Sequence, residues 1–113
     1  MNLITIVNNP YFKIENVSLN LVNGNHNDIR IYGTISLEAK NFCNCPLDFF
    51  PTIALDVINY EDNIVYCERI EPFKDVFMYD NIENSFTITI VNYSRFFELP
   101  VKEFKLYTIL KKK

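Results

Sequence analysis

The sequence predicts an all-β protein, an antiparallel β-sandwich of about seven strands that forms a single domain over residues 1–113. Ile, Val, Phe, Tyr and Leu supply most of the apolar residues, whereas Ala occurs only at Ala39 and Ala54, so helix formers are scarce. Apolar and polar residues alternate in segments spaced by roughly ten residues. A chain of 113 residues, 49% of them hydrophobic, is long enough to bury a core of its own.

The first three strands are predicted over residues 3–7, 11–22 and 28–40. Residues 3–7, LITIV, are short and β-branched. Residues 11–22 alternate clearly only in their second half, which predicts a bulge near Glu15 and Asn16. Residues 28–40 alternate throughout, as a half-buried strand does. The apolar face of this third strand would carry Ile29, Ile31, Gly33, Ile35, Leu37 and Ala39.

Four later segments predict strands: residues 51–60, 63–70, 85–93 and 103–113. Period-two alternation gives three of them an inward-facing row. These rows hold Ile53, Leu55 and Val57, then Phe86, Ile88 and Ile90, and finally Phe104, Leu106, Thr108 and Leu110.

Asparagine is expected to replace glycine in the turns, because Gly24 and Gly33 are the two glycines of the chain. After glycine, asparagine tolerates left-handed backbone best, and the asparagines cluster between the predicted strands. The triplet Glu61-Asp62-Asn63 therefore predicts a hairpin turn with Asn63 at positive φ. Acid–base chemistry by the two carboxylates would need a cleft and a partner group of matched pKa, which a loop tip does not provide.

Two segments do not alternate. Residues 94–99, SRFFEL, predict a short helix between Ser94 as N-cap and Pro100 as its stop. Residues 73–80 fit either a loop or a short edge strand. A closed barrel is the alternative to the sandwich, but barrels usually need glycines at their corners, and this chain has few.

Three segments, IRIYGTISLEAKN, PTIALDVINYEDNIVY and SFTITI, follow one another between residues 28 and 107. Their order resembles the FxLYD family of bacterial and archaeal domains. The name motif of the family would fall on residues 57–61, VINYE, where Tyr60 is kept and Glu61 approximates the acid, while Val and Asn replace Phe and Leu. Asn63 stands in place of the usual turn glycine. The resemblance implies a small immunoglobulin-like sandwich with a binding or spacer role, generally outside the cytoplasm, and no established catalytic residues.

Charge and hydropathy exclude some classes of function. A formal net charge of −3 gives little attraction for phosphates, so we expect no nucleic-acid binding. No segment reaches the roughly 18 apolar residues of a membrane helix, so we expect no membrane insertion. The start, MNLITIVNNP, has no basic region and no cleavage site. It predicts a cytoplasmic protein, or an extracytoplasmic one if a signal peptide was removed.

Three cysteines and one histidine are the candidate metal ligands. Cys43, Cys45, Cys67 and His26 would suffice for a tetrahedral zinc, although C-x-C is not the usual spacing of a structural zinc site. A disulfide from Cys67 to Cys43 or Cys45 is the alternative for an exported protein. We favour three free thiols, with Cys67 beside Val65 on a strand face as a small apolar residue. No metal and no cofactor are therefore expected.

No motif of the sequence indicates catalysis. It contains no G-x-S-x-G, no phosphate-binding glycine loop and no H-E-x-x-H. His26 lies in the polar stretch NGNHND, where a histidine is usually solvated. We therefore expect that the protein is not an enzyme.

Large rings in predicted loops are the candidate binding residues. The stretches FFP, PFKDVFMY and YSRFFELP hold more rings than strand alternation explains. Such rings either close the ends of a sandwich or form a patch for a protein partner. The candidates are Phe49, Phe50, Phe73, Phe77, Met78, Tyr79, Phe96 and Phe97.

These features predict a non-catalytic module that binds another protein, or itself as a homo-oligomer, through the aromatic loops or the sheet edges. Within this class, the chain could be a subunit of a larger assembly, a small inhibitor or immunity-type protein of microbial or phage origin, or a spacer module. A second class is a carrier of a small ligand or metal that uses Cys43, Cys45, Cys67 and His26, or an apolar cavity between the sheets. A third class is an enzyme of unrecognised type, which would need a polar cleft.

Overall fold

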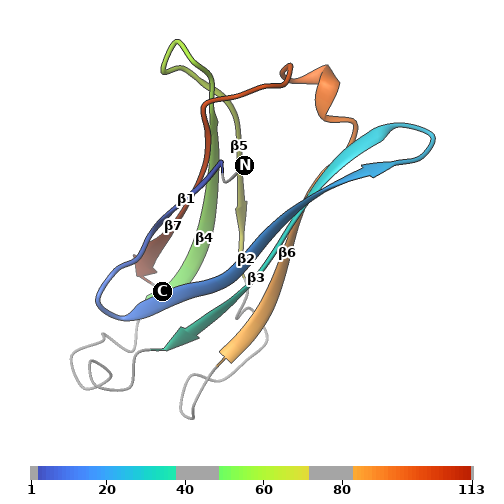
Figure 1. The fold of residues 1–113 in the computed structure, drawn as a ribbon. Coiled ribbons are helices and arrows are strands. Elements are labelled where there is room, and N and C mark those ends of the chain that lie inside the picture. The colour runs from blue at the N-terminus through green and yellow to red at the C-terminus, as the bar shows by residue number, and fades with distance from the viewer. Residues whose placement is uncertain (1–2, 38–48, 72–82, 113) are drawn as a thin grey trace.

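The chain forms a two-layer β-sandwich, and its described residues contain seven strands (Figure 1). The computed structural model describes residues 3–37, 49–71 and 83–112. The strands are β1 (Ile4–Val7), β2 (Phe12–Asn23), β3 (Asn27–Leu37), β4 (Phe49–Ile58), β5 (Ile64–Ile70), β6 (Glu83–Ile90) and β7 (Glu103–Lys112), and a 3₁₀ helix, η2 (Tyr93–Arg95), follows β6. The predicted all-β sandwich is thus confirmed. Within the described ranges, no helix has the length and hydropathy to cross a membrane.

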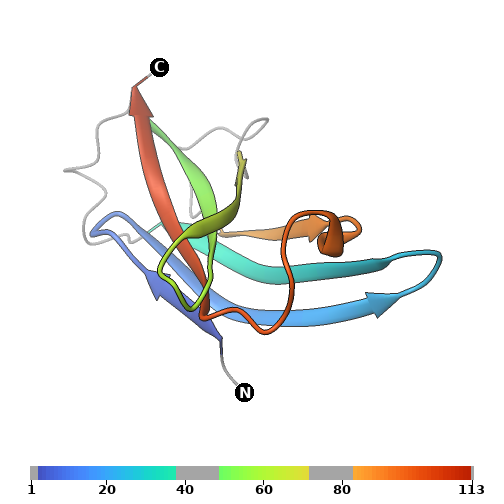
Figure 2. The same ribbon diagram turned by 90° about the horizontal axis from the view of Figure 1, so that it is seen from above.

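The strands are divided between a four-stranded sheet, in the order β1-β7-β4-β5, and a three-stranded sheet, in the order β2-β3-β6. Seen from above, β4, β5 and β7 lie on one side of the molecule and β2, β3 and β6 on the other (Figure 2). Four strand pairs are antiparallel, but β1 runs parallel to β7, so the prediction of a wholly antiparallel arrangement is wrong. Only strands joined by a tight turn must run antiparallel, and β1 and β7 come from opposite ends of the sequence.

Each sheet turns an apolar row toward the other. Leu55 pairs with Leu106 and Ile31 pairs with Ile88, and none of these side chains is more than 1% exposed. Burial of such a side chain stabilises a fold by about 1.5–3 kcal/mol. The predicted inward rows are buried where burial is described, except that Thr108 is only partly buried. Leu21, on the alternating half of β2, is 55% exposed because the β2–β3 hairpin extends past the sandwich (Figure 1). The core consists of Phe12, Ile14, Ile29, Ile31, Ile35, Ile53, Leu55, Val57, Phe86, Ile88, Ile90, Phe97, Val101, Phe104 and Leu106.

Asparagine side chains shape the start of β2, as their turn role predicts. Asn9 Oδ1 accepts hydrogen bonds from the backbone N–H groups of Tyr11 and Phe12, both at 2.8 Å. Asn8 Oδ1 accepts another from the N–H of Ile14 at 2.9 Å. These bonds satisfy backbone donors where the chain passes from one sheet to the other.

The predicted bulge in β2 is confirmed. The register with β3 shifts between Glu15 and Ser18, and Asn16 has a φ of 56°. Its side-chain Nδ2 donates to Thr34 Oγ1 at 3.3 Å. Because β2 is an edge strand, the bulge also disturbs the free edge on which another strand could pair.

The helical turn begins before its predicted start. It spans Tyr93–Arg95, and its N-cap is Asn92, so the prediction of Ser94 as the cap is wrong. Asn92 has a φ of 51°, and its backbone N–H donates to Asp28 Oδ1 at 2.9 Å. This bond to β3 stabilises the left-handed backbone directly after β6, and the chain enters the 3₁₀ turn at that point.

Gly33 permits a close packing contact inside the sandwich. A Cβ atom at this position would lie 2.5 Å from Phe86 Cζ and 3.2 Å from Val17 Cγ2. Phe86 pairs with Gly33 across β3 and β6 and is only 5% exposed. An aromatic ring that covers a cross-strand glycine supplies the packing that the glycine lacks.

Replacement of Gly33 by alanine is expected to lower the free energy of unfolding by about 1–3 kcal/mol, because the Phe86 ring would have to move within a packed core. Gly24→Ala is the matched control, since its added Cβ would meet nothing closer than His26 O at 3.9 Å. We expect this control to change stability by no more than about 0.5 kcal/mol. Urea denaturation measures both variants, and equal stabilities would contradict the packing of Phe86 on Gly33.

Candidate functional site

The predicted aromatic site residues fall into three groups. Phe73, Phe77, Met78 and Tyr79 lie outside the described residues. Phe49 and Phe50 begin strand β4 and do not lie in the loop predicted for them, because β7 is long enough to pair with both. Phe96 and Phe97 follow η2 and are fully described.

Phe96 and Phe97 have opposite environments although they are neighbours. Phe97 is 7% exposed, and its ring centroid lies 5.7 Å from that of Tyr93 and 6.3 Å from that of Phe104. Phe96 is 48% exposed. The core therefore accounts for Phe97, whereas Phe96 is available for contact with another molecule.

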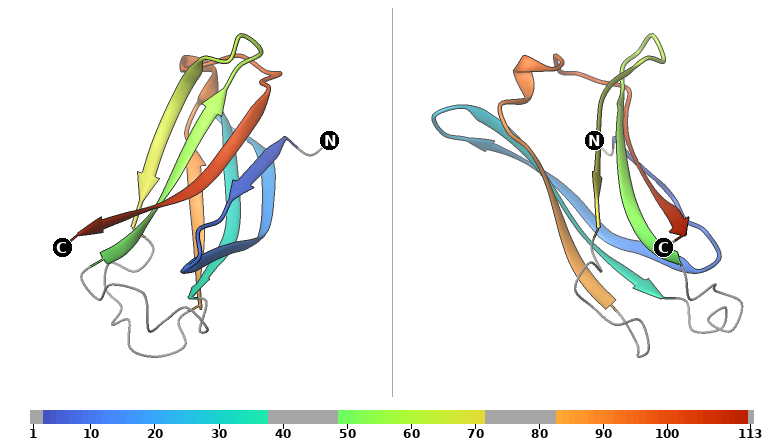
Figure 3. Two further views of the ribbon diagram at one scale, coloured as in Figure 1. Left: turned by 90° about the vertical axis from the view of Figure 1, so that its left-hand side faces the viewer. Right: turned by 180° about the vertical axis from the view of Figure 1, so that it is seen from behind.

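Phe96 lies where other large apolar side chains are exposed. Its ring centroid is 5.0 Å from that of Tyr66 on β5. Tyr60, in the β4–β5 connection, is 64% exposed, and Ile64, the first residue of β5, is 59% exposed. The β4–β5 connection lies at the same end of the sandwich as η2 (Figure 3). Tyr60, Ile64, Tyr66 and Phe96 are called the aromatic end below. Exposed rings and aliphatic side chains gathered in one region are typical of protein-binding surfaces.

Strand β5 carries a carboxylate on its inward face. Glu68 pairs with Leu55, which belongs to the core, and directly paired residues share a face of the sheet. Glu68 Oε2 is buried, and no hydrogen-bond partner reaches it. None of the ion pairs among the described residues includes Glu68. The next residue, Arg69, belongs to the opposite face because side chains alternate along a strand.

Tyr66 and Glu68 interact on this inward face. Burial raises the pKa of the Glu68 carboxyl above its usual value, and the hydrogen bond with Tyr66 opposes this shift without cancelling it. The pKa of the Tyr66 hydroxyl is also raised, first by burial and then by the negative charge of Glu68. The pair thus places an incompletely satisfied negative charge beside the partly buried ring of Tyr66.

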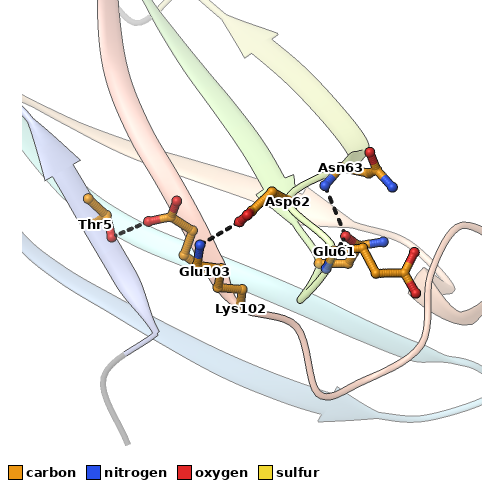
Figure 4. A network of polar contacts seen from close by, with 7 residues as sticks. Thr5, Glu61, Asp62, Asn63, Lys102 and Glu103 are labelled. Atoms are coloured by element: carbon orange, nitrogen blue, oxygen red, sulfur yellow. Dashed lines mark hydrogen bonds and ion pairs between the residues drawn. The ribbon is translucent and has the colours of Figure 1, made fainter.

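The β4–β5 turn is held by side chains and does not bring its carboxylates together. Its positive φ, 64°, is at Asp62, so the prediction of Asn63 for this role is wrong. Asn59 Oδ1 accepts from the backbone N–H groups of Glu61 and Asn63, both at 3.0 Å, which leaves Asp62 at the tip. Asp62 forms an ion pair with Lys102, while the Glu61 side chain points away from it (Figure 4). The predicted turn role of the triplet is confirmed.

The same close-up shows how β1 is attached to the sandwich. Thr5 Oγ1 donates a hydrogen bond to Glu103 Oε2 at 2.7 Å (Figure 4). The backbone N–H of Phe104 donates to Leu3 O at 2.8 Å. These contacts and four paired residues join the short strand β1 to β7.

The outward face of the four-stranded sheet is polar and largely satisfied. Tyr107 Oη donates to Asp56 Oδ2 at 3.0 Å, and Lys105 Nζ lies 5.7 Å from the centroid of the Tyr107 ring. Burial, followed by the hydrogen bond with Asp56, raises the pKa of the Tyr107 hydroxyl. The hydroxyl and ring of Tyr107 are thus engaged within its own sheet.

The candidate metal ligands do not form a described site. Cys67 is a free thiol as predicted, but it is exposed, so its predicted role as a packed apolar residue is wrong. His26 lies in the β2–β3 turn, with Nδ1 3.1 Å from Asp28 Oδ1. Cys43 and Cys45 lie outside the described residues. Within the described part of the chain, no three His, Cys, Asp or Glu side chains are grouped to hold a metal ion.

Tyr66 and Glu68 are functional candidates that the sequence does not indicate. Their spacing of two residues places them on one face of a strand. That this is the inward face follows from the pairing of Glu68 with Leu55, after a register shift between Val57 and Ile58. A bulge of this kind removes the phase information that alternation alone would give.

The chain matches no protein-family model, no curated protein and no solved structure. The aromatic end and Glu68 are therefore interpreted from their own geometry.

Glu68→Gln is expected to raise the melting temperature at neutral pH, because it removes a partly desolvated charge that no cation of the described residues pairs. The raised pKa means that the folded protein holds the Glu68 proton more tightly than the unfolded chain does. The associated stability is present below the usual glutamate pKa and is lost as pH rises through the raised value. The advantage of Glu68→Gln over the native protein should therefore shrink toward the usual glutamate pKa.

Melting curves from acid to neutral pH measure this difference, with exposed Glu83→Gln on β6 as the control that should show little change. A Glu68→Gln protein that is less stable than the native one at neutral pH would show that the carboxylate is already paired.

The two neighbouring phenylalanines provide a second test. Phe97→Ala is expected to cost about 3–5 kcal/mol of stability, the usual result of removing a buried ring. Phe96→Ala should lower the free energy of unfolding by about 1 kcal/mol or less. About half of the Phe96 surface is already in water, and its ring contact with Tyr66 adds only a small stabilisation. Urea denaturation of both variants gives the comparison, and a larger loss for Phe96→Ala would contradict the assigned environments.

Proposed function

We propose that the chain is a non-catalytic protein-binding module that engages its partner through the aromatic end. The observation that carries the proposal is the exposure of Phe96, 48%, beside a phenylalanine that the core buries. If Phe96 and Phe97 only closed the end of the sandwich, both rings would be buried, but only that of Phe97 is. Aromatic residues in such positions contribute a large share of the binding energy of protein interfaces.

The aromatic end is held on well-connected elements, which favours binding. Tyr66 belongs to β5, and the start of η2 is tied to β3 by the hydrogen bond between Asn92 and Asp28. The backbone N–H of Lys102 donates to Ile58 O at 2.9 Å, so the segment after η2 is joined to the end of β4. A surface that is ordered before binding loses less conformational entropy in the complex.

The proposal includes an immunoglobulin-like arrangement and the resemblance to FxLYD domains. The split into three and four strands and the antiparallel neighbours within each sheet support it. The parallel β1–β7 pair is a departure from a wholly antiparallel sandwich. In sandwiches of this class, the connections gathered at one end commonly form the binding surface.

Phe96→Ser is expected to weaken partner binding by at least about 30-fold, the loss that corresponds to a hot-spot residue worth roughly 2 kcal/mol. Sedimentation velocity of the purified chain first determines whether the partner is a second copy. If the chain is monomeric, a partner is captured from the native host and identified, and its affinity is measured by calorimetry with the purified protein.

Val7→Ser is the matched control, because Val7 is 47% exposed but lies on β1, outside the aromatic end. It should bind the same partner with native affinity. The proposal fails if Phe96→Ser keeps native affinity, and also if Val7→Ser loses as much affinity as Phe96→Ser does.

A further inference from the structure

We propose that Tyr66, Glu68 and Phe96 form a recognition site for an arginine side chain that the protein partner presents. This inference rests on the proposed function and specifies the chemistry of the partner at the aromatic end. The site combines a carboxylate that has no cation among the described residues with the ring of Tyr66, which in turn contacts that of Phe96.

The carboxylate supplies the first half of the argument. Glu68 Oε2 is buried without a hydrogen-bond donor, and no lysine or arginine of the described residues forms an ion pair with Glu68. Glu68 as a whole is only partly buried, so part of its side chain, though not Oε2, is accessible from outside. A carboxylate in these surroundings gains more from an incoming N–H donor than a fully solvated one does. The net charge of −3 also favours a basic partner.

The rings supply the second half. Tyr66 lies between the other two residues: it hydrogen-bonds Glu68, and its ring is 5.0 Å from that of the exposed Phe96. A guanidinium is planar, stacks on aromatic faces and donates several N–H groups in a fixed fork. Its aliphatic stem can lie along apolar surface while its head reaches the carboxylate. Arginine therefore suits this combination better than lysine, which offers a compact, strongly hydrated charge.

The charge of Glu68 also has a simpler explanation, protection of a sheet edge, which the experiment must distinguish from arginine binding. β5 is an edge strand, and an inward-pointing charge on such a strand discourages pairing with the edges of other molecules. This explanation accounts for the charge, but it requires neither the hydrogen bond to Tyr66 nor an exposed ring beside it. Under edge protection alone, the protein would have no preference for a guanidinium.

Titration of the native protein with N-acetylarginine amide, followed by NMR of the Tyr66 and Phe96 ring protons, tests the site without the natural partner. We expect saturable shifts of these rings with a dissociation constant in the millimolar range, on the order expected for a single side chain. N-acetylcitrulline amide, a neutral probe of nearly the same shape, should bind at least about 10-fold more weakly, because the charge is removed.

Glu68→Gln is expected to bind the arginine probe at least about 10-fold more weakly than the native protein does. Glu83→Gln should bind this probe with native affinity. Melting curves of both variants verify that they are folded. The inference is overturned if the citrulline probe gives equal shifts, if Glu68→Gln retains the arginine response, or if the folded native protein shows no saturable shift.

The identified partner separates this inference from the proposed function. Partner binding that is lost in Phe96→Ser but native in Glu68→Gln would leave the binding surface intact and reject the arginine site. If the native protein binds the arginine probe but Phe96→Ser binds the partner with native affinity, the proposed binding surface is rejected instead.

Discussion

Mutual burial of one apolar face from each sheet is the constraint on which the rest of the structure depends. Neither sheet could shield its row of Ile, Leu, Val and Phe side chains from water alone. The pairing of Gly33 with Phe86 shows how closely side chains pack on the inward face of the three-stranded sheet. The constraint weakens at an edge strand, which has a neighbour on one side only. β5 is such a strand, and its inward face carries Tyr66 and Glu68 in place of aliphatic residues.

The edge strand β5 thus carries residues that lower stability but are available for binding. Glu68 places a partly desolvated charge where an aliphatic residue would fit the pattern, and proteins usually keep such departures at sites that serve a purpose. Phe96 is a second departure, since the same short segment buries Phe97 and leaves Phe96 in solvent. Tyr66 contacts both residues and joins the two departures into one surface. Stability and binding should therefore respond in opposite directions at Glu68.

Alternation predicts the strands and the core well, because the facing of a side chain is a local property of an extended chain. The features it does not predict depend on contacts between distant residues. The start of η2 is set by the bond between Asn92 and Asp28, which are 64 positions apart, and no pattern near Asn92 contains it. Composition draws attention to Phe96 and Phe97 together, but only packing distinguishes the exposed ring from the buried one. Glu68 could not be assigned to the inward face because a bulge shifts the register just before it.

The central claim is that β5 holds a partly desolvated carboxylate that has no cationic partner among the described residues. The most direct measurement is a carbon-detected NMR titration of the Glu68 side-chain carboxyl in the native protein. We expect its midpoint above the usual glutamate range, and a lower midpoint when a guanidinium is bound, because a nearby cation favours the charged form. A midpoint at or below the usual range in the free protein would show that the carboxylate is already solvated or paired, and would contradict the account.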